Sequence, residues 1–275
     1  MWLYQQVSFV QKLEEDQMNS RIGASFENAE TVDLYLLRPP YPQRLYDLLI
    51  ERSPSNQRLL DLGCGHGKIA RHLAPHFEEV TAIDPSKRMM ALGKTLENGM
   101  AQNLHWVEGL AEDTPLSGKY DLIVAALSIH WMDHARLFPK LAKHLNPDYL
   151  FGVIEGDDAH EPPWHTDMDA FLGKWVPEVT GKPFVQNRTN QFWTRYTKYV
   201  EVTEKHELIS APIEQSVSDF ILCQHSRDTF AISKLGDRLK RFDAELEELL
   251  SPHADENSNL TFRSCTRLAT GKLAA

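Results

Sequence analysis

Short apolar runs alternate with longer segments of helical spacing between Leu59 and about Glu155. The runs at 80–83 and 120–127 are short and almost wholly apolar, which favours buried strands. Residues 43–51, ahead of this region, are predicted to form a helix. Strands that alternate with helices form parallel sheets, because their connections are right-handed crossovers. The pattern therefore predicts an α/β fold.

The alternation is absent on the N-terminal side and is interrupted after Glu155. Residues 1–18 place apolar side chains near helical spacing and predict an amphipathic helix, and residues 26–41 are interpreted as a connector. Residues 156–197 are rich in proline, tryptophan and charge, and interrupt the pattern.

The C-terminal third returns to regular periodicity. Residues 199–208 alternate well enough for a strand, and residues 216–250 predict two helices that are broken near Gly236. Residues 260–273 alternate again and predict the last strand.

Three glycines at alternate positions follow the first apolar run: Gly63, Gly65 and Gly67. Glycine allows a sharp turn and a close approach to a ligand, because it has no Cβ atom. The G-x-G-x-G spacing is neither the dinucleotide motif nor a P-loop. Asp61, two residues before the first glycine, would repel a pyrophosphate and suits a ligand with a cationic amine. A helix-like segment, 68–73, follows the loop.

A second acid, Asp84, ends the apolar run at 80–83. It lies seventeen residues past Gly67 by the numbering (84 − 67 = 17). In α/β nucleotide sites, a carboxylate about 20 residues beyond the glycines accepts hydrogen bonds from the ribose hydroxyls. The two acids therefore predict a nucleoside ligand that also carries an amine.

These motifs resemble those of the class I S-adenosylmethionine-dependent methyltransferases, and most closely the small-molecule branch called methyltransferase type 11, which is aconitate methyltransferase-like. The resemblance rests on four segments in the family's order: 59–73, 80–84, 109–113 and 120–131. It implies a Rossmann-like fold with a seven-stranded, mostly parallel sheet, an antiparallel last strand and helical cap insertions. It also implies S-adenosyl-L-methionine as the cofactor.

The resemblance assigns cofactor contacts residue by residue. It implies that Asp61 and the glycines shape the loop near the methionine amine, that Asp84, followed by Pro85, holds the ribose, and that a connector closes over the cofactor. The implied cofactor-binding residues are Tyr35, Arg38, Asp61, Gly63, Gly65, Gly67, Asp84, Pro85, Ala111, Glu112, Ala126 and Leu127. Two positions depart from the family pattern. Leu110 replaces an acid in the adenine loop, and Asp148-Tyr149 replaces a glycine pair.

Inserted segments are expected to cap the substrate, since class I folds bind it above the carboxyl ends of the strands. The expected organisation is an N-terminal helix and connector at 1–42, a core at 43–155 and 199–275, and substrate-cap insertions at 156–198 and 213–255.

Candidate catalytic groups follow the strands at the same edge. His130 comes directly after the fourth strand and is placed to act as a general base or to orient an acceptor, although a local turn role is the alternative. Asp157 follows the fifth strand, where a solvated loop is the alternative, and Tyr41 lies in the connector. The candidate substrate contacts are Tyr41, His130, Trp131 and Trp164. No metal is expected, because His130 and His134 have no further ligand cluster.

The composition and charge of the chain exclude some classes of partner and location. A formal charge of −10 and a pI near 5.6 disfavour nucleic acid. The sequence has no run of 18 apolar residues, so no membrane span is expected. Residues 1–21 do not resemble a secretory signal. Three scattered cysteines fit a reducing cytoplasm. The oligomeric state is not predicted.

The predicted activity is methyl transfer to a small-molecule acceptor, with O- or carboxyl-methylation favoured. The sulfonium makes the methyl group electrophilic, so the protein mainly aligns the nucleophile and excludes water. The alternative is an enzyme that cyclises or cleaves the methionine part of the same cofactor and releases methylthioadenosine, because fold does not fix reaction.

Overall fold

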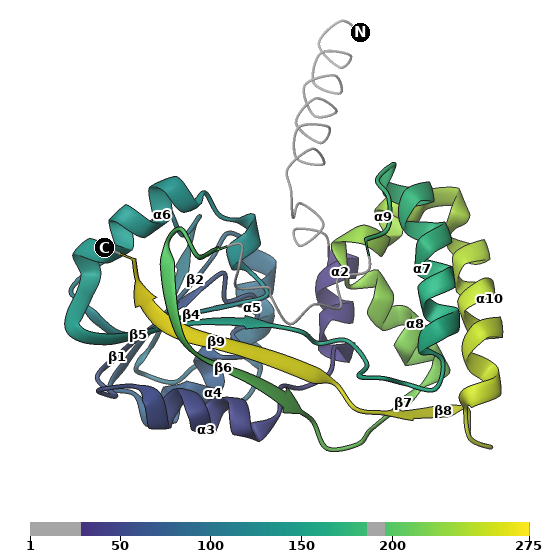
Figure 1. Ribbon diagram of the computed structural model, residues 1–275, viewed down its shortest axis with the longest axis horizontal. Helices are drawn as coiled ribbons and strands as arrows, with labels where there is room; N and C mark the ends of the chain where they lie inside the picture. The colour runs from purple at the N-terminus through teal and green to yellow at the C-terminus, as the bar shows by residue number, and fades with distance from the viewer. Residues whose placement is uncertain (1–28, 186–195, 275) are drawn as a thin grey trace, which may run out of the picture.

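The computed structural model describes residues 29–185 and 196–274. The predicted N-terminal helix at 1–18 lies outside these residues, as do Phe192, Trp193, Arg188 and Arg195 of the cap insertion. Figure 1 shows a sheet flanked by helices, and beside it a group of helices that packs on its own core.

A seven-stranded sheet forms the core, in the order β3-β2-β1-β4-β5-β9-β6. Strands β1 to β5 are parallel, whereas β9 runs antiparallel to both of its neighbours. The predicted class I fold is therefore confirmed, including its antiparallel last strand. The sheet strands are β1 (Arg58–Leu62), β2 (Glu79–Asp84), β3 (Leu104–Glu108), β4 (Tyr120–Ala126), β5 (Leu145–Glu155), β6 (Val200–Ile209) and β9 (Cys265–Leu273).

Helices cover both faces of this sheet and bury its central strands. Every residue of β4 from Tyr120 to Ala125 is buried, as expected for a strand with helices on both faces. The helices around the core are α2 (Ala29–Leu34), α3 (Gln43–Arg52), α4 (Ala70–Leu73), α5 (Lys87–Thr95) and α6 (His134–Leu141). The N-caps are built locally: Ser86 Oγ accepts from the N–H of Met89 at 3.2 Å to start α5.

A second group of elements, here called the helical cap, stands at one end of the sheet (Figure 1). It contains α7 (His165–Thr180), α8 (Val217–His225), α9 (Ile232–Leu235) and α10 (Leu239–Leu250), with the antiparallel pair β7 (Ile213–Ser216) and β8 (Asn259–Phe262). Its core is aromatic, with Trp164, Phe171, Trp175, Phe220 and Phe242 in contact. Helix α2 packs against both α5 of the core and α8 of the cap.

One feature adds to the expectations for this half of the chain, and one expectation needs correction. The segment 156–197 contains the sixteen-residue helix α7, whose hydrophobic face is obscured in the sequence by Pro177 and by charged residues. The single strand expected at 260–273 is broken at 263–264, so that β8 pairs with β7 in the cap and β9 pairs in the main sheet.

The chain leaves β5 through Gly156, which makes a tight turn over β9. Its φ is +91°, and a Cβ atom there would lie 2.4 Å from the carbonyl oxygen of Cys265. An L-residue therefore cannot take this place without moving the backbone of β9.

We expect Gly156→Ala to lower the free energy of unfolding by at least about 2 kcal/mol, because the clash adds to backbone strain. Gly173→Ala, in the middle of α7 with nothing within 4 Å of a new Cβ, is the matched control and should stabilise by up to about 1 kcal/mol. Denaturant unfolding of both variants tests this. An equal effect of the two substitutions would contradict it.

Candidate active site

The glycine loop joins β1 to α4 at the carboxyl edge of the sheet. Gly63, Gly65 and Gly67 all have positive φ, at +64°, +54° and +74°. A Cβ on Gly63 would lie 2.5 Å from Cβ of Ser128, and one on Gly67 would lie 2.5 Å from the ring of Trp106. The first and third glycines are thus required by their neighbours as well as by their dihedral angles.

Asp84 at the end of β2 holds this loop from the next strand. One carboxylate oxygen accepts from the N–H of Gly65 at 2.7 Å, and the other from the N–H of Ser86 at 2.8 Å. Burial raises the pKa of Asp84 to about 6, although both N–H groups act in the opposite direction. Each oxygen has a second lone pair with which it can accept a hydrogen bond from a hydroxyl group.

Asp61 lies beneath the loop and is only 1% exposed. Its Oδ2 accepts from the N–H of Ala70 at 3.0 Å, whereas its Oδ1 has no hydrogen-bond partner among the described residues. Burial raises the pKa of Asp61 to about 7. A buried carboxylate with an unsatisfied oxygen is costly, and a nearby cation or N–H donor would compensate for it. The unsatisfied acceptor oxygen fits a ligand that carries an amine.

The loop after β3 provides a second unsatisfied oxygen. Glu112 Oε1 accepts weakly from the N–H of Asp133 at 3.5 Å, and its buried Oε2 has no partner among the described residues. Ala111 beside it is buried, and its carbonyl accepts from Lys140 Nζ at 2.8 Å. The unpaired oxygen suits an exocyclic amine of adenine.

The end of β4 is the third strand end at this edge. Leu127 has a φ of +52°, a strained value for a side chain of its size, and such strain concentrates at functional sites. Its N–H donates to the carbonyl of Ile154 at 2.9 Å. Ser128 Oγ donates to the carbonyl of Leu62 at 2.6 Å and ties the ends of β4 and β1 together. Ala126, before Leu127, is half-buried.

The connector that carries Tyr35, Arg38 and Tyr41 packs directly on the glycine loop. The ring of Tyr35 meets that of His66 edge-on, with centroids 5.4 Å apart, and the Arg38 guanidinium lies 4.1 Å above the Tyr35 ring. Lys68 Nζ donates to the carbonyl of Pro39 at 2.8 Å. Tyr35 and Arg38 therefore lie close to the loop, as a cofactor-binding role requires.

His66 is a site residue that the sequence interpretation missed. It stands between Gly65 and Gly67, is 3% exposed, and neither ring nitrogen has a partner among the described residues. Burial, reinforced by Lys68 and Arg71, lowers the pKa of His66 to about 3, so that the ring is neutral. The one available signal was an imidazole inside a glycine loop.

His130 and Trp131 form a short 3-10 turn after β4, with ring centroids 4.5 Å apart. Both are exposed, and Trp131 is 39% exposed. Both therefore remain candidates for contact with an acceptor. His134 Nε2 lies 2.8 Å from the carbonyl of Ile129, so it faces backbone. Among residues 29–185 and 196–274, no cluster of three or more His, Cys, Asp or Glu side chains is arranged to hold a metal.

Three candidates, Trp164, Tyr41 and Asp157, lie in surroundings that do not suit the roles expected of them. Trp164 is 1% exposed and packs on Phe220 and Phe262 in the cap core, so it offers no surface to an acceptor. Burial raises the pKa of Tyr41 well above its ordinary range, which keeps its hydroxyl protonated.

Asp157 is ion-paired rather than poised to accept a proton. It is 4% exposed and lies 3.3 Å from Arg38 and 3.1 Å from Arg227. Burial would raise its pKa, but the two guanidinium groups hold that pKa well below its usual range. So weak a base does not fit the catalytic role expected of this residue.

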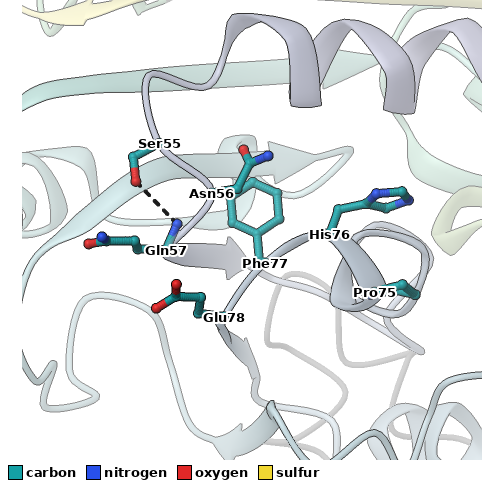
Figure 2. A pocket seen from close by; sticks show the side chains of 7 residues that line it. All are labelled: Ser55, Asn56, Gln57, Pro75, His76, Phe77 and Glu78. Carbon is teal, nitrogen blue, oxygen red and sulfur yellow. Dashed lines mark hydrogen bonds between the residues drawn. The ribbon is translucent and has the colours of Figure 1, made fainter.

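Figure 2 shows a separate hollow at the other edge of the sheet, where β1 and β2 begin. Its titratable side chains are His76 and Glu78, and its one drawn hydrogen bond runs from the N–H of Gln57 to Ser55 Oγ at 3.3 Å. Ligands of open α/β sheets bind outside the carboxyl ends of the strands, so this hollow is not the candidate site. It is lined by Ser55, Asn56, Gln57, Pro75, His76, Phe77 and Glu78.

Comparison with known proteins agrees with this geometry. A family model described as a methyltransferase domain matches residues 59–148, which hold the glycine loop, Asp84 and the end of β4. Residues 59–148 are thus similar to a methyltransferase domain, and the chain has the class I methyltransferase fold. S-adenosylmethionine, the cofactor that the sequence resemblance implies, carries amines that fit the unsatisfied oxygens of Asp61 and Glu112.

The curated relatives of this chain include uncharacterized methyltransferases. An uncharacterized methyltransferase, Rv3342, from Mycobacterium tuberculosis is 29% identical over 166 residues, covering 58% of this chain and 66% of that protein. Trans-aconitate 2-methyltransferase from Deinococcus radiodurans is 33% identical over 143 residues, covering 51% of this chain and 53% of its own length. The chain thus spans less than two thirds of the length of the curated relatives that it matches.

A solved structure shares the fold over most of this chain. It is that of a protein proposed to be a type II methyltransferase from Anaeromyxobacter dehalogenans, with a TM-score of 0.66 and 20% identity. The match covers 86% of this chain and 97% of that one. Within the described residues, no helix of this methyltransferase is long and apolar enough to cross a membrane.

The raised pKa of Asp61 predicts how the stability of the ligand-free protein depends on pH. The folded state retains the proton up to about pH 7, whereas the unfolded state loses it near 3.8. The unfolded state therefore binds fewer protons across this window, and stability falls as pH rises from about 4 to about 7. We expect this decline to be smaller in Asp61→Asn by about 4 kcal/mol, because each of the roughly three pKa units corresponds to about 1.4 kcal/mol.

Denaturant unfolding at several pH values measures the decline. Asp148→Asn, at a side chain that is 78% exposed, is the control and should follow the wild-type profile. A profile for Asp61→Asn that coincides with the wild type would show that Asp61 does not carry a raised pKa.

Proposed function

We propose that this protein transfers a methyl group from S-adenosylmethionine to a small-molecule acceptor. The observation that carries the proposal is the pair of buried carboxylates at one sheet edge, Asp61 and Asp84, which flank a loop of three left-handed glycines. One acid is bonded to the loop itself and the other retains an unsatisfied oxygen. Nucleoside and amine recognition from the same loop is what S-adenosylmethionine requires.

The cofactor contacts are proposed from the geometry of the strand ends. Asp84 would accept from the ribose hydroxyls, Asp61 would face the methionine amine through the loop, and Glu112 Oε2 would take the adenine amine. Ala126 and Leu127 would flank the methionine part. Tyr35 and Arg38 would cover it from the connector, while Pro85 and Ala111 would border the nucleoside. When bound, the cofactor supplies an electrophilic methyl group.

The remaining task of the protein is to place the acceptor in line with that methyl group and to exclude water. The helical cap and the connector are proposed to form the acceptor side. His130 and Trp131, at the end of β4, are the proposed acceptor contacts, with His130 Nδ1 or Nε2 accepting a proton from a hydroxyl acceptor. A carboxylate is already ionised at neutral pH and needs no base.

Small carboxylic acids are the acceptors that we would test first. The support is the name of one relative, trans-aconitate 2-methyltransferase. Hydroxyl acceptors are the second group, because His130 at the end of β4 is the proposed base for them. Nucleic acid is not proposed as a partner, since the formal charge is −10.

The proposal is tested by incubating the purified protein with S-adenosylmethionine and a panel of carboxylic and hydroxyl acceptors, and following adenosine products by mass spectrometry. Formation of S-adenosylhomocysteine that depends on an acceptor is the expected result. Methylthioadenosine formed without an acceptor would overturn the proposal.

Replacing His130 by alanine separates the two acceptor classes. With a hydroxyl acceptor, kcat should fall by about 100-fold or more, as general-base catalysis contributes that much. With a carboxylate acceptor, kcat should change little. His144→Ala serves as the control, because that imidazole bonds the carbonyl of Gly118 at 2.8 Å, away from the strand ends at this edge. Unchanged turnover of a hydroxyl acceptor by His130→Ala would exclude His130 as the base.

A further inference from the structure

Asp157 occupies a fixed position between three parts of the molecule. Gly156 before it makes the tight turn over Cys265 that directs the chain out of β5. The Asp157 carboxylate is buried, with 4% of its side chain exposed. Its two oxygens face different segments: Oδ2 faces Arg38 of the connector at 3.3 Å, and Oδ1 faces Arg227, just after α8 of the cap, at 3.1 Å.

The connector and the cap are also joined directly through Arg38. Its Nε donates to Ser226 Oγ at 2.9 Å, and its Nη2 donates to the Ser226 carbonyl at 2.8 Å. A further bond runs from Gln215 Nε2 to the carbonyl of Leu37 at 2.9 Å. The cap is thus bonded to the connector at several points, and Asp157 neutralises the two guanidinium groups that meet there.

The other side of the connector rests on the glycine loop. Arg38 Nη1 donates to the Tyr35 hydroxyl at 3.2 Å, and the Tyr35 ring contacts His66 between the second and third glycines. Lys68, just after the loop, donates to the carbonyl of Pro39. A continuous set of contacts therefore runs from α8 through Ser226, Arg38 and Tyr35 to the loop.

Removal of one partner from a buried ion pair leaves the other charge uncompensated in a medium that solvates it poorly. Without the Asp157 carboxylate, Arg227 would keep its ion pair with the exposed Asp158, whereas Arg38 would have no carboxylate partner among the described residues. Arg38 would then be expected to turn toward water, which would separate the connector from the cap. The contacts of Asp157 thus decide whether these two segments move together.

We propose that Asp157 is a positioning residue that couples the glycine loop to the helical cap, so that occupation of the loop by cofactor orders α8 and thereby the acceptor side. The inference rests on the proposed function, because the loop is taken to bind S-adenosylmethionine. It assigns to Asp157 no contact with the reacting atoms. It predicts that cofactor and acceptor sites influence each other through Arg38 and Arg227.

The test measures amide hydrogen exchange of the full chain with and without S-adenosylhomocysteine, and follows peptides from 217–250. In the wild type, the ligand should slow exchange of α8 by about tenfold, within the usual range of coupling between sites. In Asp157→Asn, the slowing should drop below about threefold while calorimetry still detects ligand binding. Asp158→Asn is the matched control, because Asp158 is 79% exposed and forms its ion pair with Arg227 rather than with the connector. It should retain the wild-type response.

Each outcome decides the matter. Full slowing of α8 in Asp157→Asn, or no slowing in a wild type that binds the ligand, would overturn the coupling and leave the proposed function intact. A wild type that binds no S-adenosylhomocysteine would instead overturn the proposed function, and the coupling with it. If Asp157→Asn does not fold, Ser226→Ala replaces it, since that change removes the acceptor of Arg38 Nε and, at the end of α8, the bond from Ser226 Oγ to the carbonyl of Cys223. An undiminished response in Ser226→Ala would also overturn the coupling.

Discussion

Two buried carboxylates fix the backbone on which the rest of the site is built. Asp84 bonds the middle glycine of the loop, and Asp61 bonds the first turn of α4, so the loop is held from both β1 and β2. Burying the two acids is unfavourable: burial raises the pKa of both, and the nearby Asp84 raises the pKa of Asp61 further. The arrangement makes sense where a cationic ligand restores the balance. The same constraint places the ends of β1, β2 and β4 around one point, since β1 lies between β2 and β4 in the sheet.

Much of the core half was predictable from sequence, because its signals are local. The apolar runs at 80–83 and 120–127 correspond to strands β2 and β4, and the glycine spacing predicted the position of the loop. The sequence resemblance also gave the antiparallel last strand. These signals are strong because each depends on burial or on backbone geometry that few residues satisfy.

The cap half was harder to predict, because its structure depends on contacts between distant segments. Helix α7 has a proline and several charges, and its apolar face becomes clear only against α10. Trp164 seemed available to a substrate, yet the cap core buries it. Asp157 looked like a loop acid, and nothing near it in sequence reveals that Arg38 and Arg227 lie on either side of it. His66 was missed because the burial of an imidazole cannot be read from its neighbours in the chain.

The edge of the sheet at β6 has a consequence for the behaviour of the protein in concentrated solution. Along Val200–Ile209, exposed side chains alternate with half-buried ones, and the exposed set includes Glu201, Lys205 and Glu207. Charged side chains on an edge strand discourage another strand from adding to it. Residues 200–209 are therefore poorly suited to seed fibril growth or strand exchange, even though the open edge of a sheet of this size would otherwise invite both.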